Sequence, residues 1–329
     1  MERCAVIDIS STSISMIVAR IEGTSVDILD RQRRHVSLLG YLDGQTLSPR
    51  GMERLMATLK DLKDTCVALA VDTCHLIGTA ALRMVDNIDE ICSVIVADTG
   101  LSPVILTGEE EAYCGYVANR SYASYPQAVM VDIGGASIEI SSLSSHEGAE
   151  DTMLSLAFGT VTLRQAFVNG MQPDTHEAKE IKRYVRAILE DAGLPGSGTF
   201  RTVVLVGATM RSLYEVYDDL WGKDGVTPGA LDYKAIKKLA RHLVKSPDRS
   251  RIILKAAPEK IHVLVISALI VREIMRRFKP ETILLSDSGV KEGWLISQNR
   301  GETADPSMGV QIDARLYDGE GKGYGGKKA

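Results

Sequence analysis

The chain of 329 residues is 45% hydrophobic and 25% charged, a composition that excludes global disorder, collagen-like sequence and a coiled coil. Thirty-eight Lys and Arg residues against 43 Asp and Glu residues give a net charge of −5, which argues against a protein that binds a polyanion over its whole surface. Because domains typically hold ~100–200 residues, the length predicts two of them.

The elements of the first part of the chain follow from its apolar runs. Residues 3–9, 14–21 and 26–29 are separated by Ser, Thr and Gly turn signals, which predicts a three-stranded meander. Ser48 followed by Pro49 is typical of the start of a helix. Further elements are predicted at 66–71 (a buried strand), 87–100 (a helix) and 103–106 (a strand).

The second part of the chain repeats the alternation of strands and helices. The predicted elements are strands at 128–133, 201–206 and 281–285, and helices at 174–193, 233–244 and 262–278. The helix at 262–278 is apolar over most of its surface, which predicts that it is buried. A meander followed by alternating strands and helices indicates a mixed α/β fold.

Two segments 124 residues apart resemble each other. The segment DISSTSI, which begins at Asp8, and the segment DIGGASI, which begins at Asp132, match at Asp, Ile, Ser and Ile. Each follows an apolar strand, forms a tight turn of small residues and leads into another strand. This pattern indicates an internal duplication.

The repeat and a polar, turn-rich stretch at 119–126 set the expected domain limits. We expect an N-terminal domain at 1–124 and a C-terminal domain at 125–300. Residues 301–329 contain seven of the 29 glycines and little apolar surface, so a disordered tail is predicted there.

The five cysteines all lie in the first 114 residues and form no CxxC or Cys/His zinc spacing. We expect them to be reduced and buried. No basic segment followed by a long apolar one opens the chain, and no apolar run reaches the ~18 residues of a spanning helix. A cytoplasmic protein without a membrane partner is therefore expected.

The two related turns have the composition of phosphate-binding loops. Small residues let backbone N–H groups approach an anion closely, so two such turns facing each other would clamp a phosphate. Asp8 and Asp132 at the strand ends could hold a hydrated Mg²⁺, which takes one or two carboxylates plus phosphate oxygens. Either turn alone fits an ordinary strand connection with a capping aspartate, but the pair favours phosphate.

Three consecutive glutamates, at 109–111, directly follow a predicted strand. They are typical of a helix N-terminus, where the helix dipole favours acidic residues, but one of them could serve as a general base for a water molecule. The direction of Glu139 is undecided, because the preceding turn interrupts the strand alternation. Arg83 suits a phosphate or a surface salt bridge.

Basic residues recur on one predicted helix, at offsets 0, 3, 4, 7 and 11 from Lys234. This spacing stacks Lys234, Lys237, Lys238, Arg241 and Lys245 on one helical face. Such a face suits an extended phosphate chain, although a solvated helix surface explains it equally well.

Taken in order, several segments resemble the exopolyphosphatase and guanosine pentaphosphate phosphohydrolase family of the actin-like ATPase superfamily. The resemblance covers residues 3 to about 297. It is carried by AVIDISSTSI, GTAALRMVDN, GEEEA, VDIGGASIEI, SLAFGTVTL, VGATMRSL and SDSGVKEGWL. The fold that this resemblance implies consists of two ribonuclease-H-like domains, with mixed sheets flanked by helices and a cleft between the domains.

The resemblance also implies a reaction, which is Mg²⁺-dependent release of terminal orthophosphate from polyphosphate or from guanosine pentaphosphate. By the same resemblance, Glu110 is the residue that activates water, Glu139 is the second catalytic glutamate and Arg83 binds phosphate. The implied phosphate-binding loops comprise Ser10, Ser11, Thr12, Ser13, Gly134, Gly135, Ala136, Ser137 and Gly207. The implied metal-facing carboxylates are Asp8, Asp132 and Glu139.

Several positions depart from the family pattern. The family usually has Gly where this chain has Ser10, a third glycine where it has Ala136, and Thr where it has Ile138. His262 stands where Asp is common. If Ser10 or Ala136 needs a positive φ, its side chain costs ~1–2 kcal/mol. By the same resemblance we expect the short, two-domain form of the family, without the additional C-terminal helical domains of long members.

The leading hypothesis is a hydrolase in which Glu110 takes a proton from the attacking water. The first alternative is a sensor that binds polyphosphate or guanosine tetraphosphate without efficient hydrolysis, and the second is a kinase-type member of the superfamily. No specific nucleic-acid partner is expected. The sequence leaves open the choice between the two substrates, the effect of the altered loops, the tail's role and the oligomeric state, including a homodimer.

Overall fold

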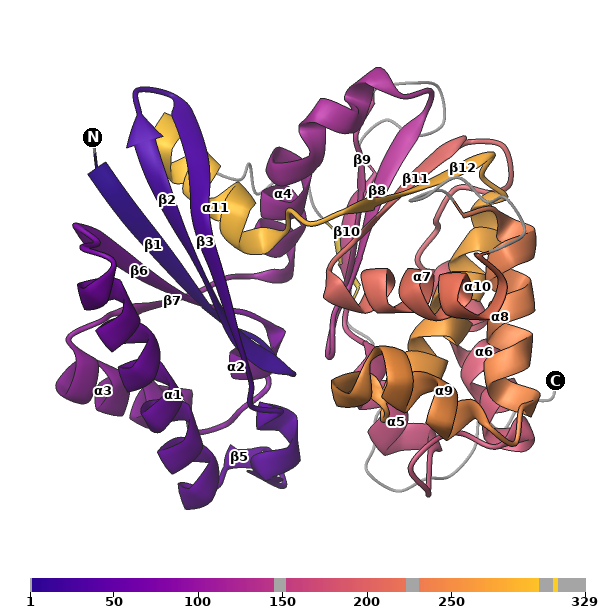
Figure 1. Ribbon diagram of the computed structural model, residues 1–329, viewed down its shortest axis with the longest axis horizontal. Coiled ribbons are helices and arrows are strands. Elements are labelled where there is room, and N and C mark those ends of the chain that lie inside the picture. Colours follow the sequence, from indigo (N-terminus) through magenta and orange to yellow (C-terminus); the bar gives the residue numbers. More distant parts are fainter. Residues whose placement is uncertain (1, 145–151, 223–230, 302–309, 313–329) are drawn as a thin grey trace, which may run out of the picture.

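The computed structural model describes residues 2–144, 152–222, 231–301 and 310–312. It contains two mixed sheets, each flanked by helices, that face each other across a central pair of helices (Figure 1). The predicted mixed α/β class and actin-like ATPase fold are confirmed by this arrangement and by the related structures reported below.

The first sheet has the strand order β3-β2-β1-β6-β7. Strands β1, β2 and β3 form the predicted antiparallel meander, and β6 and β7 run parallel to β1. Their bounds are β1 Glu2–Ile9, β2 Ser13–Glu22, β3 Ser25–His35, β6 Thr73–Gly78 and β7 Pro103–Ile105.

Helices α1 (Pro49–Ala68) and α3 (Ile88–Thr99) pack on one face of this sheet, against alternate residues of β1 such as Ala5 and Ile7. Ser48 caps α1 as predicted, since its side chain accepts a hydrogen bond from the Gly51 N–H. The predicted strand at 66–71 is wrong. Cys66 belongs to the buried stripe of α1, whose periodicity continues beyond the point where a strand was expected.

The second sheet has the order β12-β11-β8-β9-β10-β13. From β10 to β12 it repeats the first sheet strand by strand, with β8, β9 and β10 antiparallel and β11 and β12 parallel to β8. The predicted internal duplication is therefore confirmed at the level of topology. The bounds are β8 Ala128–Ile133, β9 Ile138–Ser142, β10 Met153–Leu156, β11 Thr202–Val206, β12 Thr282–Ser286 and β13 Val310–Ile312.

One face of the second sheet packs against a layer of helices and forms the largest apolar cluster. Helix α10 lies at its centre and is buried around most of its circumference, as predicted. The helices are α5 Thr160–Phe167, α6 Thr175–Asp191, α7 Ala208–Trp221, α8 Tyr233–Lys245, α9 Arg249–Ala256 and α10 Leu264–Phe278.

Helices α4 (Gly108–Asn119) and α11 (Val290–Arg300) contact each other between the two sheets (Figure 1). Trp294 and Leu295 of α11 pack on the face of the first sheet that carries Cys4 and Val6, while α4 also contacts strands of the second sheet. The chain thus passes from the first sheet to the second near 119–127 and returns to the first sheet at α11, the last helix of the described residues.

The remaining elements are short, namely η1 Leu38–Tyr41, β4 Leu42–Asp43, β5 Thr46–Leu47, α2 Ala80–Arg83, η2 Arg120–Ser124 and η4 Pro258–Lys260. Of the predicted tail, only residues 301 and 310–312 lie within the described residues, and 310–312 form β13 alongside β10. All five cysteines are free. Among the described helices, none combines the length and apolarity needed to cross a membrane.

Candidate active site between two strand-turn loops

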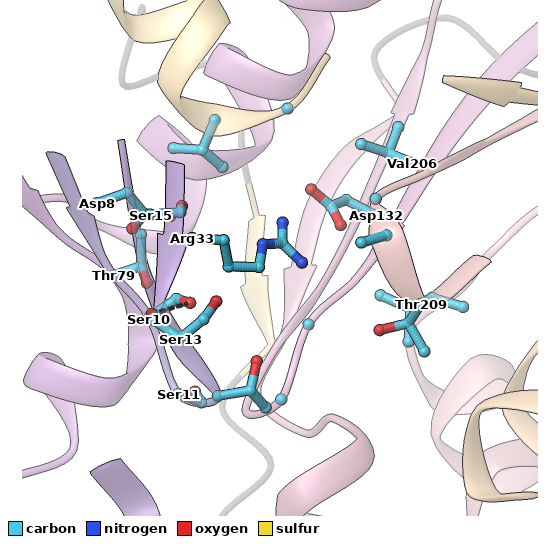
Figure 2. Close-up of a pocket in the computed structure, with 18 of the residues that line it drawn as sticks. Asp8, Ser10, Ser11, Ser13, Ser15, Arg33, Thr79, Asp132, Val206 and Thr209 are labelled. Carbon is cyan, nitrogen blue, oxygen red and sulfur yellow. Dashed lines mark hydrogen bonds between the residues drawn. The ribbon is translucent and has the colours of Figure 1, made fainter. Parts of the chain in front are cut away.

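A pocket of about 490 Å³ lies between the two sheets and is lined by residues of both halves of the chain. The strand alternation explains its walls. Asp8 lies on the same face of β1 as Cys4 and Val6, and Asp132 lies on the same face of β8 as Ala128 and Met130. Both faces point inward, so the two aspartates look into the pocket from opposite sides (Figure 2).

The first loop joins β1 to β2 and contributes Ser10, Ser11, Thr12 and Ser13 to the pocket, as predicted. Both the backbone N–H and the side-chain hydroxyl of Ser10 donate to the Ser13 carbonyl, at 3.0 and 2.8 Å. Ser10 is not among the residues with positive φ. The strain considered for a serine at this position is therefore absent, and its hydroxyl helps to close the turn.

The second loop joins β8 to β9 and brings the predicted Gly134, Gly135, Ala136 and Ser137 to the pocket. The Gly134 N–H donates to the Ser137 carbonyl at 2.9 Å, which makes the same closure as in the first loop. Ala136 is likewise absent from the positive-φ residues. Gly207 belongs to a third loop, which follows β11, and lies beside Asp132. This position does require glycine, because its φ is +98°.

Glu139 faces the pocket, which settles the direction that the sequence left undecided. It pairs with Asp132 across β8 and β9, and directly opposed residues share a face of the sheet. The Glu139 carboxylate is buried and accepts a hydrogen bond from the Ser155 hydroxyl at 3.0 Å. Burial raises the pKa of Glu139, and hydrogen bonds from Ser137 and Ser155 oppose the rise.

Of the three consecutive glutamates, the structure brings Glu111 to the pocket and not Glu110. The Glu110 carboxylate accepts a hydrogen bond from the Thr107 N–H at 2.7 Å and closes a capping box at the start of α4. Successive helical residues point in directions ~100° apart, so Glu111 turns inward and is 3% exposed. Glu110 thus belongs to the helix cap and not to the residues that line the pocket, and its role in activating water stays a prediction.

Arg83, for which the sequence left a phosphate contact and a salt bridge open, forms a salt bridge. Its guanidinium forms an ion pair with the Glu111 carboxylate and donates to the Leu106 carbonyl, and Arg83 is not one of the residues that line the pocket. Burial and the charge of Glu139 raise the pKa of Glu111 well above its ordinary value, while Arg83 acts in the opposite direction. The arginine therefore holds the glutamate and balances part of its charge.

The aspartates form the acidic side of the pocket. Burial, followed by the charge of Glu139, raises the pKa of Asp132 to about 8, and burial raises the pKa of Asp8 to about 6. Oδ1 of Asp8 is buried without a hydrogen-bond partner among the described residues. No group of three or more metal-ligating side chains occurs in the described ranges, but Mg²⁺ bound to phosphate needs only one or two carboxylates. The donor set therefore fits a hydrated divalent cation.

Five cations that sequence reasoning missed line the same pocket, namely Arg31, Arg33, Arg211, Lys260 and Lys291. Of these, Arg31 and Arg211 form ion pairs with Glu292 and Asp287. Arg33 extends into the middle of the space between the two walls (Figure 2). A signal for it existed, because Arg31, Arg33 and His35 alternate along β3 and therefore share a face. Lys260 is only 4% exposed and carries no comparable sequence signal.

Comparison with known proteins relates this geometry to one family. The profile of the Ppx/GppA phosphatase family matches residues 17–301. Guanosine-5'-triphosphate,3'-diphosphate pyrophosphatase of Aeromonas salmonicida is 27% identical over 296 residues, which are 88% of this chain and 58% of that protein. The enzyme of the same name from Aeromonas hydrophila is 30% identical over 218 residues, 64% of this chain and 43% of that protein. The chain thus spans about half the length of these relatives.

Two solved structures share the fold. The Aquifex aeolicus member of the Ppx/GppA family has a TM-score of 0.72 and 24% identity, covering 91% of this chain and 98% of its own. An exopolyphosphatase from Cytophaga hutchinsonii has a TM-score of 0.78 and 18% identity, covering 92% and 99%. Together with the profile match over most of the sequence, the fold and the cleft confirm the predicted resemblance: this chain belongs to the Ppx/GppA phosphatase family.

Proposed function

We propose that the chain is a phosphoanhydride hydrolase that releases terminal orthophosphate from inorganic polyphosphate, guanosine pentaphosphate or both. The observation that carries the proposal is the pair of buried carboxylates, Glu111 and Glu139, that face a pocket walled by two related strand-turn loops. The relatives reported above are named as a guanosine-5'-triphosphate,3'-diphosphate pyrophosphatase and an exopolyphosphatase. These names support the proposed substrate class.

Glu111 is the proposed general base. A base works best when its pKa lies near the working pH, and burial together with the neighbouring Glu139 moves the pKa of Glu111 upward from the ordinary range. A proton taken from the attacking water would rest on the Glu111 carboxylate. Arg83 holds this carboxylate in place through its ion pair and is a positioning residue in this scheme.

Glu139 is proposed to orient the attacking water, or to face the metal as the resemblance implies. The Ser155 hydroxyl donates to it at 3.0 Å and Ser137 gives a further hydrogen bond, so its carboxylate is fixed from two sides. This rigidity keeps the carboxylate from swinging away as charge develops on the substrate.

Cations of the pocket are proposed to neutralise the phosphoryl oxygens. Arg33 offers a planar fork that suits two oxygens at once, whereas Lys260 and Lys291 act as point charges. Phosphoryl transfer depends mainly on positioning and charge neutralisation of this kind. The backbone of the loops at 10–13 and 134–137 would provide further donors for the terminal phosphate.

Mg²⁺ is the proposed cofactor, with Asp8 and Asp132 as the residues that would hold it. The raised pKa values of these two carboxylates show that their negative charges are poorly compensated in the pocket. A bound cation would supply the missing positive charge. When bound, the cation would supply charge neutralisation on the phosphate oxygens. Localisation in the cytoplasm is a further expectation, and the oligomeric state, including a homodimer, stays open.

The test compares Glu111→Gln with Glu110→Gln as a matched control on the same helix. Orthophosphate release is measured from medium-chain polyphosphate and from guanosine pentaphosphate with Mg²⁺. Glu111→Gln is expected to lower kcat by at least ~100-fold, the usual contribution of a general base, with binding retained. Glu110→Gln is expected to keep kcat within about twofold, because Glu110 does not line the pocket. Its capping box contributes to helix stability instead, by ~1 kcal/mol.

A loss of activity in Glu110→Gln, with Glu111→Gln still active, would reverse the assignment of the base. If the wild type binds either compound in a calorimeter but releases no phosphate, the chain is a sensor instead of a hydrolase. The sensor alternative rests on the altered residues of the two loops. Since Ser10 and Ala136 have no positive φ and are not strained, the structure removes this argument and favours the hydrolase.

A further inference from the structure

The exposed face of α8 carries a continuous row of cations outside the active-site pocket. We call it the α8 cationic face, and it consists of Lys234, Lys237, Lys238, Arg241 and Lys245. All five residues are exposed. The opposite face of the helix is buried in the core of the second domain through Ala235, Ile236, Leu239, Ala240 and Leu243. The row is therefore fixed in place by a rigid, well-packed helix.

Four of the five cations of the α8 cationic face have little acidic compensation among the described residues. Helix α8 contains no Asp or Glu between Tyr233 and Lys245. Within the residues that the structure describes, no acidic side chain forms an ion pair with Lys234, Lys237, Arg241 or Lys245. Like charges three or four residues apart on a helix repel one another, in a chain whose net charge is −5. A bound polyanion would relieve this repulsion.

The cations also border a groove. A concavity of about 550 Å³ is lined by the α8 cationic face together with Trp221 and His242. Nζ of Lys238 lies 4.1 Å from the centre of the Trp221 ring, and the His242 ring meets that ring edge-on at 5.3 Å. The aromatic ring thus holds Lys238 in place, and the only tryptophan on this side of the molecule adjoins the charged row.

We propose that the α8 cationic face is a second anion site that binds the body of an inorganic polyphosphate chain whose end is hydrolysed in the cleft. This inference rests on the proposed function. The row extends over the 11 residue steps from Lys234 to Lys245, or ~16 Å at 1.5 Å per step, which suits an extended polymer and not a single phosphate. Helix α8 lies on the side of the second domain away from the first sheet (Figure 1), so only long chains reach both sites.

The composition of the face favours inorganic polyphosphate over nucleic acid. Four of its five cations are lysines, which bind phosphate as point charges without the planar fork that reads base edges. Single-stranded nucleic acids bind through aromatic side chains on which the bases stack, but at this groove Lys238 covers the Trp221 ring and the His242 ring packs edge-on against it. Inorganic polyphosphate needs only cationic contacts, and these are the contacts that the α8 cationic face offers.

Binding at this face tethers the substrate. A chain held at α8 keeps its free end near the cleft and raises the effective concentration of ends there. The face should therefore lower KM for long chains and leave kcat unchanged. Tripolyphosphate and guanosine pentaphosphate are too short to occupy both sites and gain nothing from it.

The first experiment measures binding without hydrolysis. Trp221 fluorescence is followed while long-chain polyphosphate of about 100 phosphates is added to the full chain without Mg²⁺. We expect a saturable change that is absent in Trp221→Phe. Lys237→Gln/Arg241→Gln should weaken binding about fivefold or more and make it less dependent on salt, because fewer counterions are released.

The control for this double variant is Arg50→Gln/Arg54→Gln. It removes two exposed cations at the same four-residue spacing from α1, on the other domain. Equal weakening by both double variants would overturn the proposal, as would tighter binding of single-stranded RNA than of polyphosphate under the same conditions. Since this titration needs no turnover, it still tests the site if the protein proves not to be a hydrolase.

The second experiment measures phosphate release from tripolyphosphate and from the long chain. In Lys237→Gln/Arg241→Gln we expect KM for the long chain to rise about three- to tenfold, with kcat and the tripolyphosphate KM unchanged. The α1 control should behave as the wild type. A KM that rises equally for both substrates would show that the change acts on the cleft and would refute the tether.

Discussion

Lys260 is a buried cation, and the free energy that its burial costs can be measured. It is 4% exposed in the wall of the cleft. Burial, followed by the charge of Arg33, lowers the pKa of Lys260 to about 8. Since its ordinary pKa is 10.5, the folded protein binds the Lys260 proton less tightly than the unfolded chain does. The protonated lysine therefore opposes folding below pH 8, and this effect fades as the pH rises from 8 to 10.5.

Lys260→Met should accordingly stabilise the protein while impairing substrate binding. At pH 7 we expect the free energy of unfolding to rise by up to ~3 kcal/mol, the value of a shift of this size, and the gain should shrink by about half or more at pH 9.5. KM for polyphosphate should increase at pH 7. Urea unfolding at the two pH values tests this, and a variant less stable than the wild type at pH 7 would contradict it.

The choice among the three glutamates shows where sequence reasoning reached its limit at the residue scale. The sequence indicates chemically important residues in the segment 108–112 and, near the strand ends, at Asp8 and Asp132. Which glutamate faces the pocket depends on where α4 begins, and that is set by Thr107, whose capping box uses Glu110. A shift of one residue in the start of a helix turns every side chain by ~100°.

Helices α4 and α11 approach each other closely at Gly293, which has no side chain to keep them apart. A Cβ placed on Gly293 would lie 1.7 Å from the carbonyl oxygen of Cys114 in α4, so no larger residue fits without moving one helix. Because α11 also packs on the first sheet through Trp294 and Leu295, this contact joins the last helix to the wall that carries Glu111.

Gly293→Ala is expected to destabilise the protein by about 3 kcal/mol or more, as overpacking against backbone does. The sign is diagnostic, because alanine in place of glycine normally stabilises a helix by ~1 kcal/mol. Thermal unfolding measures the effect. Gly40→Ala serves as the control, since nothing lies within 4 Å of its added Cβ, and a Tm for Gly293→Ala equal to that of the control would refute the close contact.

At the scale of elements, local patterns predicted most of the strands and helices but not their partners. The meander, the repeat and the buried α10 follow from periodicity in short windows. The return of α11 to the first sheet does not, because its sequence specifies an apolar stripe and not the surface that covers it. The C-terminal end of α1 was missed for a related reason, since a short apolar run fits a strand or a buried helix equally well.

The two halves of the molecule are copies of one topology that meet at their loops. In each half the first strand carries an aspartate as its penultimate residue, and the following turn lines the cleft. The loops touch closely, because a Cβ placed on Gly135 would lie 2.7 Å from Cβ of Ser11 in the other half. The width of the cleft, where we propose that phosphate binds, therefore depends on how the two halves pack, and duplication places equivalent loops on either side of it.

Gly135→Ala tests this dependence for the whole molecule. The new methyl group would wedge the loops apart at Ser11, and displacements of about 1 Å in such sites cost up to ~100-fold in rate. We expect kcat/KM for polyphosphate to fall at least tenfold with little change in Tm. Ser11→Gly added to Gly135→Ala removes the clashing Cβ and should recover part of the loss, whereas Gly196→Ala, with open space around its Cβ, should behave as the wild type. Full activity in Gly135→Ala, or a double variant no better than the single one, would show that the halves do not set the width of the site through this contact.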